Sequence, residues 1–289
     1  MQKKSRQLLL TATLFFVAVF LFFAQRSFSQ NVNYVKVSFL DVGQGDAIFI
    51  EAPNGVQVLV DGGPGDAVQR QLPEVMRFWD RSIDILVATH PDADHIGGLP
   101  EVLRRYRVDY VLDTEIGSDT GVYDEYTYQR DRSRAERIQA QAGGVIVLDR
   151  ERGVFIEVLF PGKNIIDVSD KNDTSIVLRL VYGESEVLLT GDASTKIEKY
   201  LVSKYGKNLE SDILKLGHHG SKTSTSEEFL QVVSPSSVVI SAGKDNRYGH
   251  PHQEVIRGVQ DFGSNIYSTN EADAVRFMMR ADSILFQSR

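Results

Sequence analysis

The hydrophobic residues of this chain recur in short runs interrupted by turn residues, a pattern typical of many strands with helices between them. The first half predicts strands at 34–40, 47–51, 56–60, 83–88 and 108–112. The second half predicts strands at 145–148, 155–160, 176–181, 187–189, 213–216 and 238–241, and a closing hairpin at 274–286. Helices are predicted at about 66–79, 97–106, 124–142, 194–205, 227–233 and 253–262. Two strand-rich halves with interspersed helices predict an α/β (α+β) fold of two packed sheets flanked by helices.

The first 29 residues differ from the rest of the chain. Lys3, Lys4 and Arg6 precede an uncharged, mostly apolar run at 8–24, and small residues surround Phe28. This order predicts a secretory signal peptide. An uncleaved membrane anchor is the alternative, because the run is close to the shortest span of a bilayer. A buried helix of the domain ranks last, since basic residues adjoin one end of the run. We therefore expect residues 30–289 to form the exported domain.

The composition excludes several kinds of chemistry. The chain of 289 residues fits one large domain or two small ones. It has no cysteine, which excludes disulfides, cysteine-bound zinc and a thiol nucleophile. Its net charge of −7 means that a nucleic acid would need a local basic patch or bound metal. The arginines of the predicted helix 124–142 alternate with acidic residues, which favours a solvated helix face over a rim that steers phosphates.

All six histidines fall in three short clusters. The first cluster places His90, Asp92, Asp94 and His95 in one loop after a predicted strand. Imidazole nitrogen suits zinc, and carboxylate oxygen suits zinc, manganese or magnesium. A solvated polar loop is the alternative for one such cluster, but the absence of histidine elsewhere favours a metal site.

The other two clusters lie in the second half. His218 and His219 follow a predicted strand, so we expect their side chains to point to opposite sides. His218 is favoured as a metal ligand, and His219 as the residue that orients it or donates a proton. His250 and His252 flank Pro251. His250 is a candidate ligand or general acid, and His252 is either a substrate contact or a residue that begins a helix.

Further polar residues follow predicted strands. Asp61 is expected to orient a histidine of the site rather than to bind metal. Asp41 and Asp46 flank a glycine turn, and each either stabilises this turn or belongs to the site. Asn172 or Asp173 is either a weak metal ligand or a substrate contact, and Ser221 and Lys222 are further candidate contacts to substrate. The cations Lys215, Lys244 and Arg247 would suit an anionic substrate.

Taken together, the ordered motifs resemble those of metallo-β-lactamase-fold hydrolases. The first cluster, His90-x-Asp92-x-Asp94-His95, looks like a variant of their His-x-His-x-Asp-His motif, and Thr190-Gly191-Asp192 is similar to their bridging aspartate. From residue 34 onward the motifs resemble more narrowly the C-terminal hydrolase domain of the ComEC DNA-uptake proteins. The resemblance implies a four-layer αββα sandwich and two divalent ions, zinc or manganese. The implied ligands are His90, Asp92, Asp94, His95, Asp192 and His218. Asp92 replaces a histidine, which either favours manganese over zinc or leaves that site weakly filled.

The resemblance also implies a reaction. Two bound ions would activate a water for hydrolysis, with Asp94, Asp192, His219 and His250 as catalytic residues. No Gly-x-Ser-x-Gly elbow offers a serine nucleophile instead. The expected substrate is DNA, and the membrane is expected to be contacted only through residues 1–29, if these are not cleaved. The many transmembrane helices of ComEC are missing, which leaves a role in DNA uptake open. The alternatives are a lactone or carboxylic-ester hydrolase, and a degenerate module that binds metal or nucleic acid without turnover.

Overall fold

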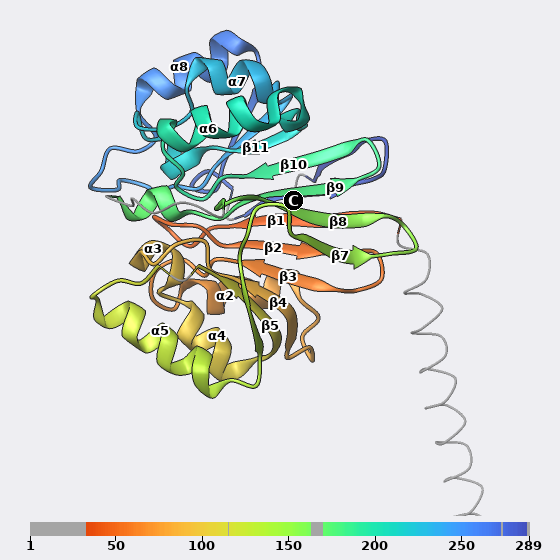
Figure 1. The fold of residues 1–289 in the computed structure, drawn as a ribbon, viewed down its shortest axis with the longest axis vertical. Coiled ribbons are helices and arrows are strands. Elements are labelled where there is room, and N and C mark those ends of the chain that lie inside the picture. The colour runs from red at the N-terminus through yellow and green to blue at the C-terminus, as the bar shows by residue number, and fades with distance from the viewer. Residues whose placement is uncertain (1–32, 115, 163–169, 273, 288–289) are drawn as a thin grey trace, which may run out of the picture.

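Two β-sheets packed face to face form the centre of the protein, and helices cover their outer faces (Figure 1). The computed structural model describes residues 33–114, 116–162, 170–272 and 274–287, so the predicted leader 1–29 lies outside it. The first sheet has the order β15-β14-β1-β2-β3-β4-β5-β6, and the second has the order β13-β12-β11-β10-β9-β8-β7. This arrangement confirms the predicted sandwich.

The first sheet joins the first half of the chain to its last hairpin, because β14 pairs antiparallel with β1. Its strands β3 to β6 run parallel to one another. The strands are β1 (Val35–Leu40), β2 (Ile48–Glu51), β3 (Gln57–Val60), β4 (Ser82–Val87), β5 (Arg107–Asp113), β6 (Glu136–Gln139), β14 (Ala274–Met279) and β15 (Ile284–Gln287). The helices that follow its strands are α2 (Ala67–Val75), α3 (Ala93–Ile96), α4 (Leu99–Arg105) and α5 (Gly121–Arg132).

The second sheet has the same character, with antiparallel strands followed by parallel ones from β10 to β13. The strands are β7 (Val145–Asp149), β8 (Val154–Phe160), β9 (Val177–Tyr182), β10 (Ser185–Leu189), β11 (Ile213–Lys215), β12 (Ser237–Ile240) and β13 (Asn265–Ser268). Its helices are α6 (Thr195–Tyr205), α7 (Glu227–Val233) and α8 (Gln253–Phe262), with short 3₁₀ turns η1 (Lys171–Thr174), η2 (Gly206–Leu209) and η3 (Gly217–Gly220).

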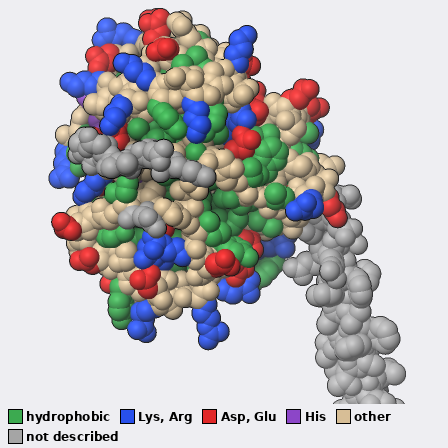
Figure 2. Space-filling view, in the orientation of Figure 1, with side chains coloured by type: hydrophobic (Ala, Val, Ile, Leu, Met, Phe, Trp, Pro, Cys, Tyr) green, Lys and Arg blue, Asp and Glu red, His purple; other side chains and the backbone are tan. Residues whose placement is uncertain are grey.

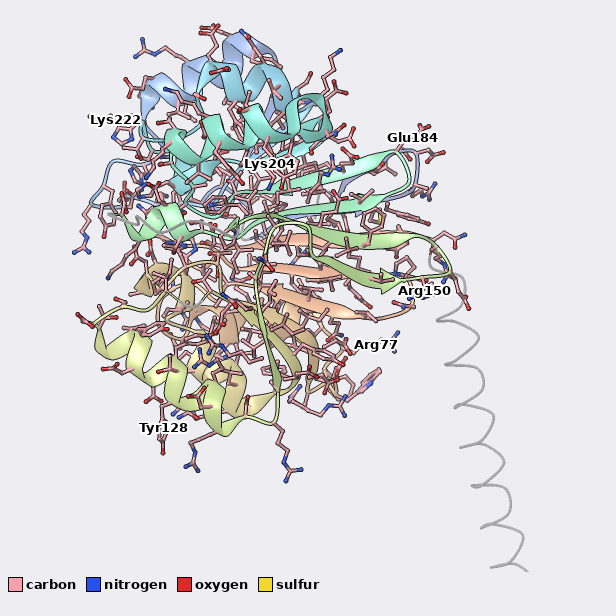
Figure 3. All side chains as sticks on the ribbon, viewed as in Figure 1. Arg77, Tyr128, Arg150, Glu184, Lys204 and Lys222 are labelled. Atoms are coloured by element: carbon pink, nitrogen blue, oxygen red, sulfur yellow. The ribbon has the colours of Figure 1, made fainter. Side chains whose placement is uncertain are left out.

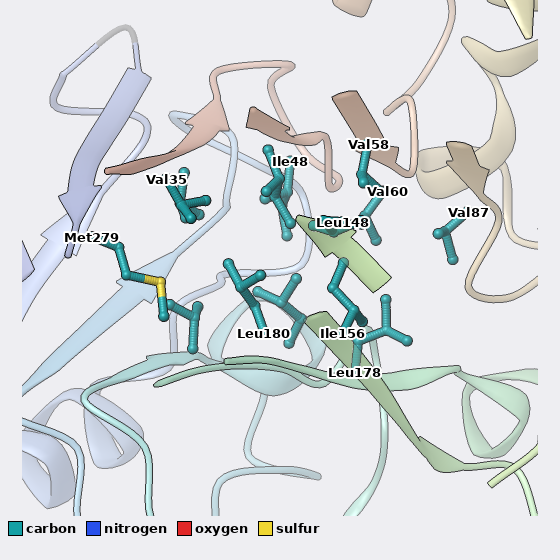
Figure 4. Packing of buried hydrophobic residues seen from close by; sticks show 14 of the residues in the cluster. Val35, Ile48, Val58, Val60, Val87, Leu148, Ile156, Leu178, Leu180 and Met279 are labelled. Carbon is teal, nitrogen blue, oxygen red and sulfur yellow. The ribbon is translucent and has the colours of Figure 1, made fainter. Parts of the chain in front are cut away.

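Three apolar clusters hold the layers together. The central cluster lies between the sheets, where side chains such as Val35, Ile48 and Leu178 interdigitate (Figure 4). A second cluster packs α2, α4 and α5 on the first sheet, and a third packs α6, α7 and α8 on the second. Burial of this much apolar surface from both faces explains why the strands read as nearly continuous hydrophobic runs.

One predicted helix is wrong in its second half. The polar segment 124–142 does not form a single helix: α5 ends at Arg132, and residues Glu136–Gln139 form the edge strand β6. Buried Asp113 accounts for this, because it binds both Arg130 of α5 and Arg137 of β6. These two arginines are therefore structural, and the tertiary ion pairs override the local helix preference.

Beside β6 the sandwich is open at its edge. Apolar side chains of β5, β6 and β7 line a groove of about 670 Å³, and Figure 2 shows hydrophobic side chains gathered on this face where the two layers meet. Among the described residues, no helix has the length and apolar character needed to cross a bilayer.

The strand registers define two ends of the sandwich. At one end the carboxyl ends of β3 and β4 pair at Val60 and Val87, and those of β10 and β11 pair at Leu189 and Lys215. At the other end lie the first residues of β1 and the turns that follow β2, α2 and β7. Lys222 lies near the first end and Arg77 and Arg150 lie at the second (Figure 3).

Candidate metal centre

The three histidine clusters come together at the first end of the sandwich. His90 follows β4, Asp192 follows β10, and His218 and His219 lie in η3 directly after β11. The carboxyl ends of parallel strands meet at one edge of a sheet, so residues distant in sequence become neighbours here. Both sheets therefore contribute to one site.

The Asp192 carboxylate lies at the centre of this site. Two imidazoles approach it closely: His95 Nε2 is 3.3 Å from Oδ1, and His219 Nε2 is 3.4 Å from Oδ2. The Nε2 atoms of His90 and His218 each lie 3.9 Å from Oδ2. Four imidazole nitrogens thus point at one carboxylate.

Asp94 and Asp92 add two carboxylates to this arrangement. Asp94 joins a group with His219, and Asp92 joins a group with His90. Asp94 Oδ2 lies 3.3 Å from His219 Nε2. Asp92 Oδ2 lies 3.9 Å from His90 Nε2. The structure therefore brings together all six residues predicted as ligands, with Asp192 between the two groups.

These residues fit a divalent ion on two grounds. Buried atoms that make no hydrogen bond to any other described residue include Asp192 Oδ1 and the Nε2 atoms of His90, His95 and His219. Leaving so many buried polar atoms unpaired is costly unless another group binds them. Two atoms that each lie about 2.1 Å from one tetrahedral ion are about 3.4 Å apart. The separations of the His95 and His219 Nε2 atoms from Asp192, 3.3 and 3.4 Å, match this value. Those of His90 and His218, at 3.9 Å, are longer.

Each imidazole is oriented from behind through Nδ1. Asp61 lies 2.7 Å from His95 Nδ1, and the same carboxylate accepts hydrogen bonds from the Thr89 backbone and hydroxyl. His219 Nδ1 donates to the Ser241 carbonyl at 2.8 Å. Such partners fix the tautomer and leave Nε2 free for a metal. Asp61 thus has the contact expected of an orienting residue.

The expectation that His218 and His219 point to opposite sides is wrong. Both residues adopt left-handed backbone conformations, with φ of 46° and 56°. This conformation is uncommon for residues with side chains and replaces the alternation of a strand. Consequently both rings face Asp192, and His219 is buried whereas His218 is partly exposed. The geometry gives both imidazoles access to the centre.

A buried ion pair behind the centre was missed by the sequence analysis. Lys215 is fully buried, and its Nζ lies 2.5 Å from Asp46 Oδ2 and 3.7 Å from Asp192 Oδ1. It donates a hydrogen bond to the Gly191 carbonyl as well. The expectation that Lys215 contacts an anionic substrate is therefore wrong. The sequence signal was only its place three residues before the His218-His219 pair.

Asp46 belongs to the same layer. Asp46, His95, Asp192 and His219 each offer one ligand atom within 4.8 Å of the others. However, Asp46 faces the Nδ1 edges of the two rings, 3.5 Å from His219 and 4.0 Å from His95. We therefore place it behind the imidazoles rather than at the metal. Asp41 accepts a hydrogen bond from Gly43 N and stabilises the turn.

Glycine lets this turn approach the histidine loop. Gly45 has φ of +137°, and a Cβ there would lie 2.1 Å from the Asp94 carbonyl oxygen. The adjacent Asp46 N donates to that same carbonyl at 3.2 Å. Only glycine permits this contact, which holds Asp46 against the site.

The buried charges shift one another's pKa values. Burial and neighbouring His95 lower the pKa of His90 to about 3, so its Nε2 lone pair is free. Burial acts to lower the pKa of His95 and His219 too. It is outweighed by Asp192 together with Asp61 at His95, and by Asp192 together with Asp46 and Asp94 at His219, so both pKa values are raised well above the usual 6.5. For Asp192, burial acts to raise the pKa, yet His219 and His95 lower it well below its usual range. The carboxylate is thus ionised and attracts cations.

These shifts predict how the stability of the metal-free protein depends on pH. The raised pKa values of His95 and His219 contribute stability that is complete below about pH 6.5 and is lost as pH rises through the folded-state values. The lowered pKa of Asp192 contributes stability above about pH 3.9 that is lost as pH falls through its folded-state value. The lowered pKa values of His90 and His218 act the other way: below about pH 6.5 the unfolded histidines take up protons that the folded ones do not, so stability is lost as pH falls. In chelator, urea unfolding followed by circular dichroism should therefore give the highest free energy of unfolding near pH 6.5. A metal ion competes with these protons, so it should remove the alkaline decline. Stability in chelator that rises above pH 7 would contradict this.

The remaining predicted residues lie at the mouth of the site. The His250 ring is 5.4 Å from that of His218 and 4.9 Å from that of His252. His252 precedes α8 and accepts a hydrogen bond from Lys222 N. Ser221 bonds to Thr223, whose hydroxyl in turn contacts His218.

Asn172 and Asp173 differ in what they can do. Asp173 is buried and binds Ser194 and Lys196, so it holds the start of α6 and is not available as a ligand. Asn172 lies beside it in η1, and its backbone N–H donates to Asp170. Nearby, Lys171 Nζ lies 4.0 Å from Asp92 Oδ1. This edge of the mouth therefore presents Asn172 and the Lys171 ammonium.

Comparison with known proteins agrees with the fold and the motifs. Residues 40–244 match the family model described as the metallo-beta-lactamase superfamily. ComE operon protein 3 of Bacillus subtilis (strain 168) is 31% identical over 94% of this chain and 36% of its own length. Competence protein ComA of Neisseria gonorrhoeae is 36% identical over 85% of this chain and 32% of its own length. The chain thus spans about a third of these relatives.

Solved structures show the same architecture. The metallo-beta-lactamase fold protein YhfI from Bacillus subtilis has a TM-score of 0.54 at 13% identity, over 81% of this chain and 96% of its own. CmlA from Streptomyces venezuelae has a TM-score of 0.54 at 16% identity, over 85% of this chain and 54% of its own. With the family match over residues 40–244, these findings show that the chain belongs to the metallo-β-lactamase superfamily and has its hydrolase fold.

Proposed function

We propose that the protein is an exported, metal-dependent phosphodiesterase that cleaves DNA. The observation that carries the proposal is the set of four imidazole Nε2 atoms around the Asp192 carboxylate, with cations and an aromatic ring at the mouth. The similarity to competence proteins supports DNA as the substrate. The apolar run at 8–24 supports export.

The ligand residues have distinct tasks in this proposal. Two divalent ions, manganese or zinc, would lower the pKa of a water and neutralise charge on the attacked phosphate. His90, Asp92 and His218 would hold one ion, Asp94, His95 and His219 the other, and Asp192 would contact both. Burial lowers the pKa of His250 to about 4. A general acid must carry its proton at the working pH, so this favours His250 as a ligand or a proton acceptor.

The mouth suits a single strand of nucleic acid. Tyr248 is half-exposed and stacks on His250, with ring centroids 5.7 Å apart and an angle of 22° between the planes. The Arg247 guanidinium lies 4.9 Å from the Tyr248 ring, and exposed Lys222 and Lys244 are close in sequence to the histidines. Aromatic rings bind unpaired bases, and cations track the phosphates.

The test is cleavage of an end-labelled, single-stranded oligonucleotide by the full-length protein supplied with Mn²⁺ or Zn²⁺. We expect cleavage products that disappear on chelation and with Asp94→Ala. Turnover of lactones or esters without phosphodiester cleavage would overturn the proposal in favour of an ester hydrolase. Metal binding without turnover of either class would indicate a binding module.

Replacing Tyr248 by alanine should reduce kcat/KM for single-stranded DNA by about tenfold, because stacking of one base contributes about 1–3 kcal/mol. Tyr248→Trp should retain the activity. Hydrolysis of bis(p-nitrophenyl) phosphate, which has no base, should be unchanged in both variants. If Tyr248→Ala lost as much kcat/KM on an oligonucleotide that lacks the bases beside the cleaved bond, Tyr248 would not act by stacking.

A further inference from the structure

The turn between α2 and β4 exposes two large aromatic side chains side by side. Phe78 is 77% exposed, the highest value among the large hydrophobic residues that the structure describes, and Trp79 is 57% exposed. Their rings meet edge to face, with centroids 4.7 Å apart. Exposed apolar patches mark sites of interaction with proteins or membranes.

The turn that presents them is fixed. The Asp80 carboxylate accepts hydrogen bonds from Ser82 N and Oγ and from Gln57 Nε2, and Asp80 N donates to the Arg77 carbonyl. Phe78 and Trp79 are thus held outward by hydrogen bonds beneath them. Their exposure is a built feature of the turn.

Two cations flank the aromatic pair. Arg77 and Arg81 are exposed, and neither forms an ion pair with a carboxylate in the described part of the chain. Arg81 Nη1 instead donates to the carbonyls of Phe78 and Asp80. The Asp80 carboxylate is partly exposed but is hydrogen-bonded to Ser82 and Gln57, so the apolar rings are flanked by two exposed guanidinium groups. This is the chemistry of segments that bind at the headgroup level of an anionic bilayer.

The position of the turn indicates the same partner. Gln57 bonds to Asp80 and pairs with Glu51, and Glu51 pairs with Lys36 at the start of β1. The turn therefore lies at the end where the chain enters the domain, and Arg77 marks this end in Figure 3, opposite Lys222. Residues 25–32 separate the apolar run 8–24 from the domain, and an extended segment of that length spans at most about 28 Å. An apolar run in a bilayer would thus keep this end close to the lipid.

We propose that Arg77, Phe78, Trp79 and Arg81 form a membrane-docking surface that seats this end of the domain on an anionic lipid bilayer. The metal centre, at the opposite end, then faces away from the membrane. This proposal does not depend on the reaction at the metal centre.

Trp79 provides the test, because it is the single tryptophan of the chain. The full chain is reconstituted in vesicles of phosphatidylcholine and phosphatidylglycerol, with or without acyl-chain-brominated lipid. We expect the Trp79 emission to shift to the blue and to be quenched by the brominated lipid. The apolar run alone cannot cause this quenching, since it contains no tryptophan. Unshifted and unquenched emission would overturn the proposal.

Two matched variants make the test specific. A chain with Trp79→Phe and Tyr248→Trp carries its tryptophan at the opposite end, and its emission should not be quenched. Arg77→Glu with Arg81→Glu should reduce the quenching of Trp79, and circular dichroism should show that this variant is folded. Equal quenching at both tryptophan positions would contradict an oriented surface. A blue shift without lipid that grows with protein concentration would identify a second copy as the partner and would also overturn the proposal.

Discussion

Asp192→Ala is expected to lose both metal and hydrolytic activity. Asp192 is the residue that both groups of candidate ligands share, with His95 and His219 at 3.3 and 3.4 Å. Loss of a residue that merely orients a ligand costs about 10–100-fold in metal affinity or activity, and loss of a shared ligand should exceed 100-fold. Metal content by mass spectrometry and the rate of phosphodiester cleavage measure the two effects.

An exposed aspartate on α8 provides the control for this variant. Asp261→Asn removes an exposed carboxylate at the C-terminal end of α8, nine residues after His252, and should leave metal content and rate unchanged. If Asp192→Ala instead binds metal with the stoichiometry of the parent chain, the arrangement of ligands around Asp192 is wrong. Metal content is informative even if the natural substrate differs from DNA.

Lys215→Met should destabilise the fold by about 3–5 kcal/mol, since it leaves the buried Asp46 carboxylate without its partner. Lys215 is fully buried, and burial acts to lower its pKa, but Asp46 and Asp192 raise it above the usual value. The ammonium is therefore charged and compensates two carboxylates. Urea unfolding in chelator measures the effect without a contribution from bound metal.

Removing the partner as well should recover much of this loss. In the double variant with Asp46→Asn and Lys215→Met, neither charge remains, and replacing both members of a buried pair is often close to neutral. The double variant should therefore lose less free energy of unfolding than the sum of the losses in the two single variants, and the difference is the coupling energy between Lys215 and Asp46. Equal losses in the single and double variants would mean that Lys215 acts through packing alone.

Much of the architecture could be predicted from the sequence because the pattern of each strand is local. Runs such as those at 83–88 and 176–181 are buried on both faces, and turn residues interrupt them, so strands and layers follow from the pattern. The residues that gather at the centre could also be found, since histidine and aspartate cluster at strand ends. Because these residues directly follow strands in the sequence, their positions along the chain were enough to predict that they share one end of the sandwich.

The features that escaped prediction depend on tertiary contacts. A lysine is predicted to be a surface cation unless a buried partner is known. The partner of Lys215 is Asp46, which lies far from it in sequence, so the pair could not be recognised. The direction of the His218 and His219 side chains follows from their left-handed backbone, which the local sequence pattern does not predict. Strand β6 forms because Asp113 binds arginines from two segments. In each case a distant side chain decides the outcome.

The division of the metal centre between the two sheets has a consequence for the chain as a whole. His90, Asp94 and His95 come from the first half, whereas Asp192, His218 and His219 come from the second. Neither half carries a complete set of ligands, so two separately produced fragments cut between β7 and β8 would each lack the centre. Mixed together, they would regain it only by reassembling the sandwich, and metal uptake would then report reassociation of the halves.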